Sequence, residues 1–122
     1  MRRCMIIDDS SVIRKVAKHI LSGSDMLVIE AETASQALAM CQEQMPDVIL
    51  VDSMLTDMPA VDCIRSLLAL SHGAKPHIVL CVCELDVGAI MRAKRAGAAG
   101  YVFKPFTRPQ LLASLKELQL AA

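Results

Sequence analysis

Aromatic side chains are almost missing from this 122-residue chain, which contains one Tyr, two Phe and no Trp. A surface that binds nucleic acid needs an excess of basic residues and aromatic rings on which bases can stack. Here thirteen Lys and Arg residues balance thirteen Asp and Glu residues, so the formal net charge is zero. We therefore expect no direct contact with nucleic acid. The hydrophobic residues, which make up 54% of the chain, must form an aliphatic core.

Long hydrophobic runs are also missing, because the longest fall far short of the ~20 residues that a membrane span requires. The first apolar run begins almost at once, at residue 4, and no signal-peptide pattern precedes it. We therefore expect a cytoplasmic protein that does not associate with membranes. A chain of this length can bury about two thirds of its unfolded surface, which is enough for a real core and predicts one domain over residues 1–122.

The five cysteines include no CxxC pair, which disfavours a zinc or redox motif. They are Cys4, Cys41, Cys63, Cys81 and Cys83. Cys81 and Cys83 flank one residue of an apolar run and would face the same side of a strand, so a pair of metal ligands is conceivable. We favour buried thiols in a reducing compartment, because free cysteine behaves as a small hydrophobic residue.

Five short apolar runs alternate with amphipathic segments along the chain. The runs are continuous rather than alternating in polarity, which indicates parallel strands buried on both faces by helices. Right-handed crossovers then predict a doubly wound α/β sandwich of five strands and five helices. The predicted strands cover residues 4–7, 26–29, 48–51, 78–82 and 101–103.

Capping signals mark the starts of three predicted helices. A serine of the Ser10-Ser11 pair caps the helix that follows the first strand. Thr33 with Gln36, and Thr107 with Gln110, each form a capping box, in which the two side chains satisfy free backbone N–H groups at the start of a helix.

Charged residues follow three of the predicted strands at the point where each strand ends. Asp8 and Asp9 follow the first strand, Asp52 the third and Lys104 the fifth. Because ligands bind outside the carboxyl ends of the strands in open α/β sheets, we expect these groups to converge. Three carboxylates so close together would repel one another, and a divalent cation would relieve that repulsion. An all-oxygen site favours Mg2+, or Mn2+, over zinc.

Such a site is suited to phosphoryl transfer, because Mg2+ neutralises phosphoryl oxygens and an aspartate can act as the nucleophile. We assign that role to Asp52, which leaves the central strand, and we expect Asp8 and Asp9 to hold the metal. Lys104 would supply the remaining positive charge. Taken singly, each acid could instead cap a helix, but four charged groups at one edge of the sheet favour a functional site.

These positions resemble the receiver domain of two-component response regulators, and residues 8–17 are most similar to stand-alone chemotaxis-type regulators. The resemblance implies a flavodoxin-like fold with strand order 2-1-3-4-5 and no output domain. It makes Asp52 the phosphoacceptor, Asp9 a direct Mg2+ ligand and Asp8 an acid of the metal site that acts in part through water. Met54 would donate a backbone carbonyl to the metal.

The resemblance also implies partners and a switch. Lys104 would contact the phosphoryl group, its peptide bond to Pro105 would be cis, and Tyr101 matches the aromatic switch position. A histidine kinase or phosphotransfer protein would donate the phosphoryl group. A downstream protein would contact the fourth helix, the fifth strand and the fifth helix, and phosphorylation could promote a homodimer. The protein would be a regulator rather than an enzyme.

Several positions depart from the family pattern. Val82, followed by Cys83, stands where the family usually has a Thr or Ser whose hydroxyl binds the phosphoryl group. The missing hydrogen bond would be worth about 1.5 to 3 kcal/mol, so the active state would be weakened while phosphorylation remained feasible. In the loop after Asp52, Thr56 and Ala60 stand where the family usually has Pro and Gly. Asp57 in that loop is expected to add a negative charge near the site.

Three other functions remain open at this point. A degenerate receiver would bind its partner without phosphorylation, as Val82 and Asp57 suggest. A phosphatase of the haloacid dehalogenase type also forms an aspartyl phosphate, but it needs a second aspartate two residues after the nucleophile, where this chain has Met54. A flavin carrier shares the fold, but Asp8 and Asp9 stand where the FMN phosphate would need hydrogen-bond donors.

Overall fold

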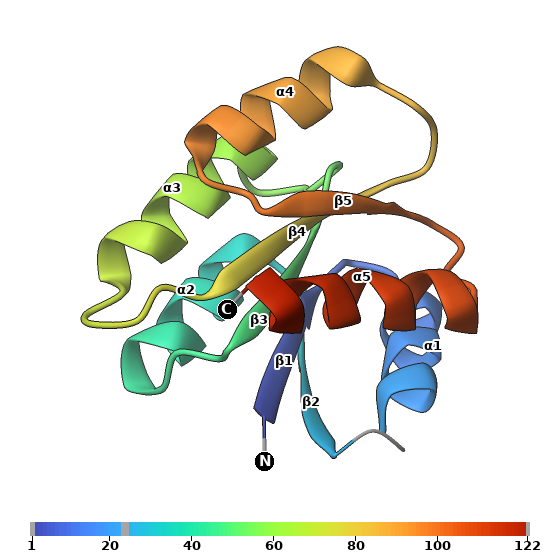
Figure 1. The fold of residues 1–122 in the computed structure, drawn as a ribbon. Coiled ribbons are helices and arrows are strands. Elements are labelled where there is room, and N and C mark those ends of the chain that lie inside the picture. Colours follow the sequence, from blue (N-terminus) through green and yellow to red (C-terminus); the bar gives the residue numbers. More distant parts are fainter. Residues whose placement is uncertain (1, 23–24, 122) are drawn as a thin grey trace.

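The computed structural model describes residues 2–22 and 25–121. Within these residues five strands and five helices alternate along the chain (Figure 1). In chain order they are β1 (Arg2–Ile7), α1 (Ser11–Leu21), β2 (Met26–Ala31), α2 (Ala34–Glu43), β3 (Val48–Asp52), α3 (Ala60–Leu70), β4 (His77–Val82), α4 (Val87–Ala96), β5 (Gly100–Phe103) and α5 (Arg108–Ala121).

The strands form one parallel sheet in the order β2-β1-β3-β4-β5, so the predicted fold and strand order are confirmed. The crossovers place α1 and α5 on one face of the sheet and α2, α3 and α4 on the other (Figure 1). β3 lies in the centre, and all five of its residues are buried. Its continuous apolar sequence follows from this position, because helices cover both of its faces.

Alternate residues of each central strand enter two separate hydrophobic layers. Ile6 and Leu50 pack with the buried sides of α1 and α5, whereas Ile7 and Val51 pack with α2, α3 and α4. Apart from Phe106 in the layer beneath α1 and α5, the large side chains of both layers are aliphatic, as the shortage of aromatic residues predicts. Because the sheet is held from both faces, the residues at its carboxyl edge have fixed positions.

The predicted cap hydroxyls all accept a backbone hydrogen bond, including that of Thr107 from Gln110 N at 3.4 Å, but neither capping box has its expected return bond among the described residues. The Ser10 hydroxyl accepts a hydrogen bond from Ile13 N, and the Thr33 hydroxyl accepts one from Gln36 N at 3.1 Å. The Gln36 side chain bonds to the backbone N–H of Glu32, one residue before the cap. In a regular capping box the Gln36 side chain would bond to the backbone N–H of Thr33, so this bond is displaced by one residue toward the N-terminus.

Four of the five cysteines are buried, as predicted, and Cys83 is exposed. The prediction was wrong for Cys83 because β4 ends at Val82, so the next residue has left the sheet. The Cys81 side chain lies in the layer beneath α1 and α5. In the part of the chain that the structure describes, no helix has the length and apolarity needed to cross a bilayer.

Candidate functional site

The charged residues meet at one edge of the sheet because neighbouring parallel strands end there. Asp8 directly follows β1, and Asp52 is the last residue of β3. β1 and β3 are hydrogen-bonded neighbours with Ile7 paired to Val51, so the two aspartates that follow this pair lie side by side. Lys104 directly follows β5, and its peptide bond to the next residue is cis, as expected.

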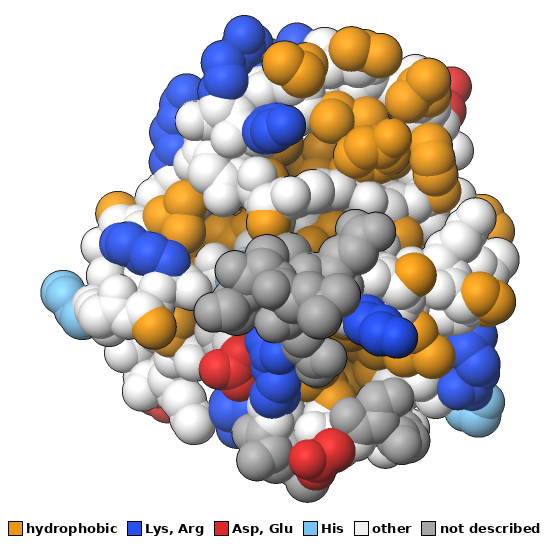
Figure 2. Space-filling view, viewed as in Figure 1, with side chains coloured by type: hydrophobic (Ala, Val, Ile, Leu, Met, Phe, Trp, Pro, Cys, Tyr) orange, Lys and Arg blue, Asp and Glu red, His pale blue; other side chains and the backbone are white. Residues whose placement is uncertain are grey.

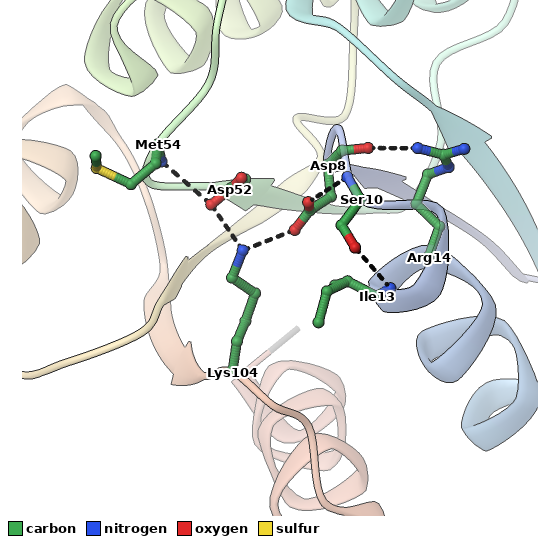
Figure 3. A network of polar contacts seen from close by, with 7 residues as sticks. All are labelled: Asp8, Ser10, Ile13, Arg14, Asp52, Met54 and Lys104. Carbon is green, nitrogen blue, oxygen red and sulfur yellow. Dashed lines mark hydrogen bonds and ion pairs between the residues drawn. The ribbon is translucent and has the colours of Figure 1, made fainter.

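Lys104 joins the two aspartates in a buried ionic cluster (Figure 3). Its Nζ atom donates to Asp8 Oδ2 at 2.8 Å and to Asp52 Oδ1 at 2.9 Å. The exposed fraction of the side chain is only 9% for Lys104, 1% for Asp8 and 3% for Asp52. Charges this deeply buried are tolerated only when they are paired and hydrogen-bonded, which each of these groups is.

The two aspartates keep Lys104 charged in spite of its burial. Burial alone lowers the pKa of a lysine, but the hydrogen bonds and negative charges of Asp8 and Asp52 outweigh it and raise the pKa of Lys104 above its ordinary value. Lys104 is therefore protonated and positively charged at physiological pH. Since one positive charge faces three neighbouring aspartates, the cluster retains an excess of negative charge.

Asp9 completes a group of acids that could hold a metal ion. One carboxylate oxygen from each of Asp8, Asp9 and Asp52 lies within 4.8 Å of the others. Asp9 is exposed whereas the other two are buried, so the cluster is open to solvent on one side. An all-oxygen set with surplus negative charge and a solvent-facing side fits Mg2+, which keeps some of its water ligands in proteins.

Asp8 is held by contacts from three directions (Figure 3). Its Oδ1 accepts a hydrogen bond from Ser10 N at 2.9 Å, and its Oδ2 accepts the bond from Lys104. Its backbone carbonyl accepts a 2.7 Å bond from Arg14 of α1, which also pairs with Glu30 of β2 at 3.1 Å. Arg14 thereby connects the loop after β1 to both α1 and β2. No pattern in the sequence indicated this role of Arg14.

Asp52 uses one carboxylate oxygen for its protein contacts. Oδ1 accepts hydrogen bonds from Met54 N at 3.1 Å and from Lys104. Among the described residues, no hydrogen bond ends on Oδ2 of Asp52. The Met54 side chain is 75% exposed, so this residue contributes to the site through its backbone. The role of its carbonyl as a metal ligand stays a prediction.

Val82 lies beside the site without a polar group. It is the last residue of β4 and is 2% exposed, and its backbone carbonyl accepts a hydrogen bond from Lys104 N at 2.8 Å. A hollow of about 370 Å3 opens next to it, and its wall includes Met54, Val82, Cys83 and Glu84. Cys83 and Val82 thus both border this hollow, which adjoins Asp52 through Met54, and the Val82 side chain also packs against the core.

Tyr101 lies apart from the acids on the surface of β5. Its ring is 42% exposed and packs edge-to-face against Phe103, with ring centroids 5.7 Å apart. The structure therefore brings Asp8, Asp9, Asp52 and Lys104 together but places this predicted switch residue outside the cluster.

Both carboxylate oxygens of Asp57 accept hydrogen bonds from the first turn of α2. Its Oδ1 accepts from Ala34 N at 3.0 Å, and its Oδ2 accepts from Ser35 N at 2.9 Å and from the Ser35 hydroxyl at 2.8 Å. These hydrogen bonds, of which those from Ser35 contribute most, hold the pKa of Asp57 below its ordinary value. The negative charge therefore caps a helix, and its effect on the neighbouring acids stays a prediction.

Comparison with known proteins agrees with this geometry. The sequence profile of the response regulator receiver domain matches residues 4–116. The chain belongs to this family. Receiver domains act in two-component signalling as regulators rather than as classical enzymes, and they typically bind Mg2+ at an acidic pocket.

This receiver domain is most readily compared with chemotaxis regulators. The chemotaxis protein CheY of Halobacterium salinarum is 26% identical over 120 residues, which cover 98% of each chain. The KDP operon transcriptional regulatory protein KdpE of Escherichia coli is 35% identical over 116 residues, which cover 95% of this chain and 50% of KdpE. The structure of the chemotaxis response regulator CheY4 of Vibrio cholerae superposes with a TM-score of 0.89 at 27% identity and covers 96% of this chain and 98% of its own.

Proposed function

We propose that this receiver domain is a phosphoryl-accepting switch and that Asp52 is the phosphoacceptor. The observation that carries the proposal is the buried bridge from Lys104 to Asp8 and Asp52, with the exposed Asp9 beside it. A structural ion pair would not need an excess of acids open to solvent. We propose in addition that residues 1–122 work as one receiver domain, because the described residues form one five-stranded sheet with helices on both faces.

Each residue has a distinct part in the proposed reaction. Asp8, Asp9, Asp52 and the Met54 carbonyl would hold Mg2+, or Mn2+, which when bound supplies positive charge to the phosphoryl oxygens. A carboxylate oxygen of Asp52 attacks phosphorus, the O–P bond forms, and the bond from phosphorus to the donor nitrogen breaks. The imidazole of the donor, a histidine kinase or phosphotransfer protein, keeps the electron pair. Lys104 then contacts the new phosphoryl group.

The output would pass through the surface formed by α4 and β5. Val87 and Met91 of α4, Tyr101 and Phe103 of β5, and Leu85 in the loop before α4 are large hydrophobic residues that are exposed. Figure 2 shows hydrophobic atoms gathered over these elements and basic side chains toward the C-terminal end of α4, whose last turn contains Lys94 and Arg95. An exposed apolar patch of this kind marks a protein-binding surface, so we assign it to the downstream protein or to a second copy after phosphorylation.

An intact-mass experiment tests the proposal. The purified protein is incubated with acetyl phosphate and Mg2+, and its mass is compared with that of Asp52→Ala under the same conditions. We expect one phosphoryl adduct on the wild type and none on the variant. An adduct of equal yield on both proteins would place the phosphoryl group elsewhere and would refute the role of Asp52.

A degenerate receiver is the second candidate, and the apolar side chain of Val82 favours it. A buried valine offers no hydrogen bond to a phosphoryl group, so the structure that a partner reads could be independent of phosphorylation. An unmodified wild type, under conditions that label a control regulator, would support this candidate against the first.

A further inference from the structure

Among the described residues, the hydrogen bonds between α2 and the loop that joins β3 to α3 all come from one side chain of that loop. Asp57 lies in this loop, five residues after Asp52, and both of its carboxylate oxygens bind the first turn of α2. The partners, Ala34 and Ser35, are 23 and 22 residues away in the sequence. The contact therefore links two segments that no local pattern would place together.

Asp57 and Thr33 divide the capping of α2 between them. Thr33, the residue at the cap position, accepts from Gln36 N. Asp57 accepts from Ala34 N and Ser35 N, two of the four N–H groups that a helix start leaves without partners. Its negative charge also suits the positive end of the helix dipole. The two caps serve the same helix, but only Asp57 belongs to the loop beside the site.

That loop carries the backbone that touches Asp52. Met54 N donates to Asp52 Oδ1, yet the Met54 side chain is exposed and cannot hold the loop in place. Leu55 and Met58 pack partly against the core, and Asp57 lies between them. Position 56 is Thr, so the rigidity that a proline would give to the backbone is missing here. A tether at residue 57 restricts the same short segment.

We infer that Asp57 is a positioning residue, which holds the backbone at Met54 in register with Asp52 and thereby sets the affinity of the acidic cluster for Mg2+. This inference rests on the proposed function of the cluster. Asp57 itself does not touch the reacting atoms. It acts through the loop, as the outer hydrogen-bond partners of metal ligands do in other proteins.

Calorimetric titration with Mg2+ tests the inference with two matched controls. Thr33→Ala weakens the start of α2 without altering the loop, and Asp62→Ala removes an exposed carboxylate from the first turn of α3. We expect Asp57→Ala to raise the Kd for Mg2+ about tenfold, the lower end of the range for residues that orient metal ligands. Both controls should stay within about twofold of the wild type, although Thr33→Ala should also lower the urea midpoint of unfolding.

Different failures of this titration have different meanings. A Kd in Asp57→Ala equal to that in Thr33→Ala overturns the positioning role and leaves Asp57 as a helix cap only. A wild type that does not bind Mg2+ overturns the proposed function instead. If Asp57→Ala does not fold, then Asp57→Asn and Ser35→Ala carry the test, since each removes part of the tether. Both should weaken Mg2+ binding by less than the full truncation, and unchanged binding in both would refute the inference.

Discussion

The Nζ atom of Lys104 lies 2.9 Å from Oδ1 of Asp52, although the two residues are 52 positions apart in the sequence. Strand order brings them together, because β4 separates β3 from β5 and the long lysine side chain extends across the end of β4. The position that a phosphoryl group on Asp52 would need is therefore already faced by a fixed positive charge. The same ammonium offsets the repulsion between Asp52 and Asp8.

Replacing Lys104 should destabilise the fold, and Mg2+ should restore part of the loss. Lys104→Met leaves two buried carboxylates facing each other without a cation, and breaking a buried ion pair costs about 3 kcal/mol. Urea unfolding with and without Mg2+ measures both effects. Lys15→Met, a change at an exposed lysine, is the control. Equal stability of Lys104→Met and the wild type would contradict the ionic role of Lys104.

Removing the charge of Asp9 should have opposite effects on stability and on metal binding. Asp9→Asn relieves repulsion at the exposed side of the acidic cluster, so the free energy of unfolding without metal should rise, by less than about 1 kcal/mol because the group is exposed. The same change removes a proposed ligand, so Mg2+ should bind at least about tenfold more weakly. Calorimetry and urea unfolding on one preparation test both. A variant that binds Mg2+ as tightly as the wild type would exclude Asp9 as a ligand.

The positions of the four charged residues could be predicted because they depend on one rule. In a parallel sheet the strand ends are on one edge, so Asp8, Asp52 and Lys104 had to meet once the five strands were recognised. Asp57 could not be placed in this way. Its contacts with α2 depend on how two loops pack, and a carboxylate in a loop has no periodicity that reveals its partner.

The surroundings of the site were predictable only in part for a similar reason. β4 ends at Val82, as predicted, so the exposure of Cys83 depends on the path of the loop that follows the strand, which hydrophobic periodicity does not report. The bond from Arg14 to the Asp8 carbonyl depends on the angle at which α1 leaves the sheet. Sequence periodicity reports which face of a helix is buried, but it does not report which backbone atom a long side chain reaches.

Gly97 should tolerate no side chain, because two constraints coincide there. Its φ angle is +120°, and a Cβ atom would lie 2.3 Å from Cδ1 of Leu68 on α3. Gly97→Ala should therefore lower the free energy of unfolding by about 1 to 3 kcal/mol, chiefly because a residue other than glycine is strained at this φ angle, whereas the half-buried Leu68 side chain can shift. Gly100→Ala is the control, since nothing lies within 4 Å of its Cβ position. Adding Leu68→Ala to Gly97→Ala should relieve the clash but not the backbone strain, so the double variant should be less stable than Leu68→Ala alone.

Cys83 should be the thiol that reacts in the native protein. Burial raises the pKa of Cys41 to about 11 and that of Cys63 to about 12, so these groups stay protonated at a pH at which an ordinary thiol ionises. Cys4 and Cys81 are buried too, and burial raises the pKa of both. Ellman's reagent at pH 8 should modify one thiol rapidly and all five in urea. Cys83→Ser should abolish the rapid phase, and a rapid phase that persists in this variant would contradict the assignment.

Restoring a hydroxyl at the end of β4 should make the protein less stable but a better receiver of phosphoryl-like ligands. Val82 is buried, so Val82→Thr places a hydroxyl in an apolar site and should lower the free energy of unfolding by about 1 to 3 kcal/mol. The same hydroxyl can donate to a group bound at Asp52, which is worth about 1.5 to 3 kcal/mol, so beryllofluoride with Mg2+ should bind at least about tenfold more tightly. Val79→Thr makes the identical change in the middle of β4 and is equally buried. It should lose stability without gaining affinity. If both variants bind beryllofluoride as the wild type does, the hydroxyl at position 82 cannot reach the ligand, and the weakness attributed to Val82 has another origin.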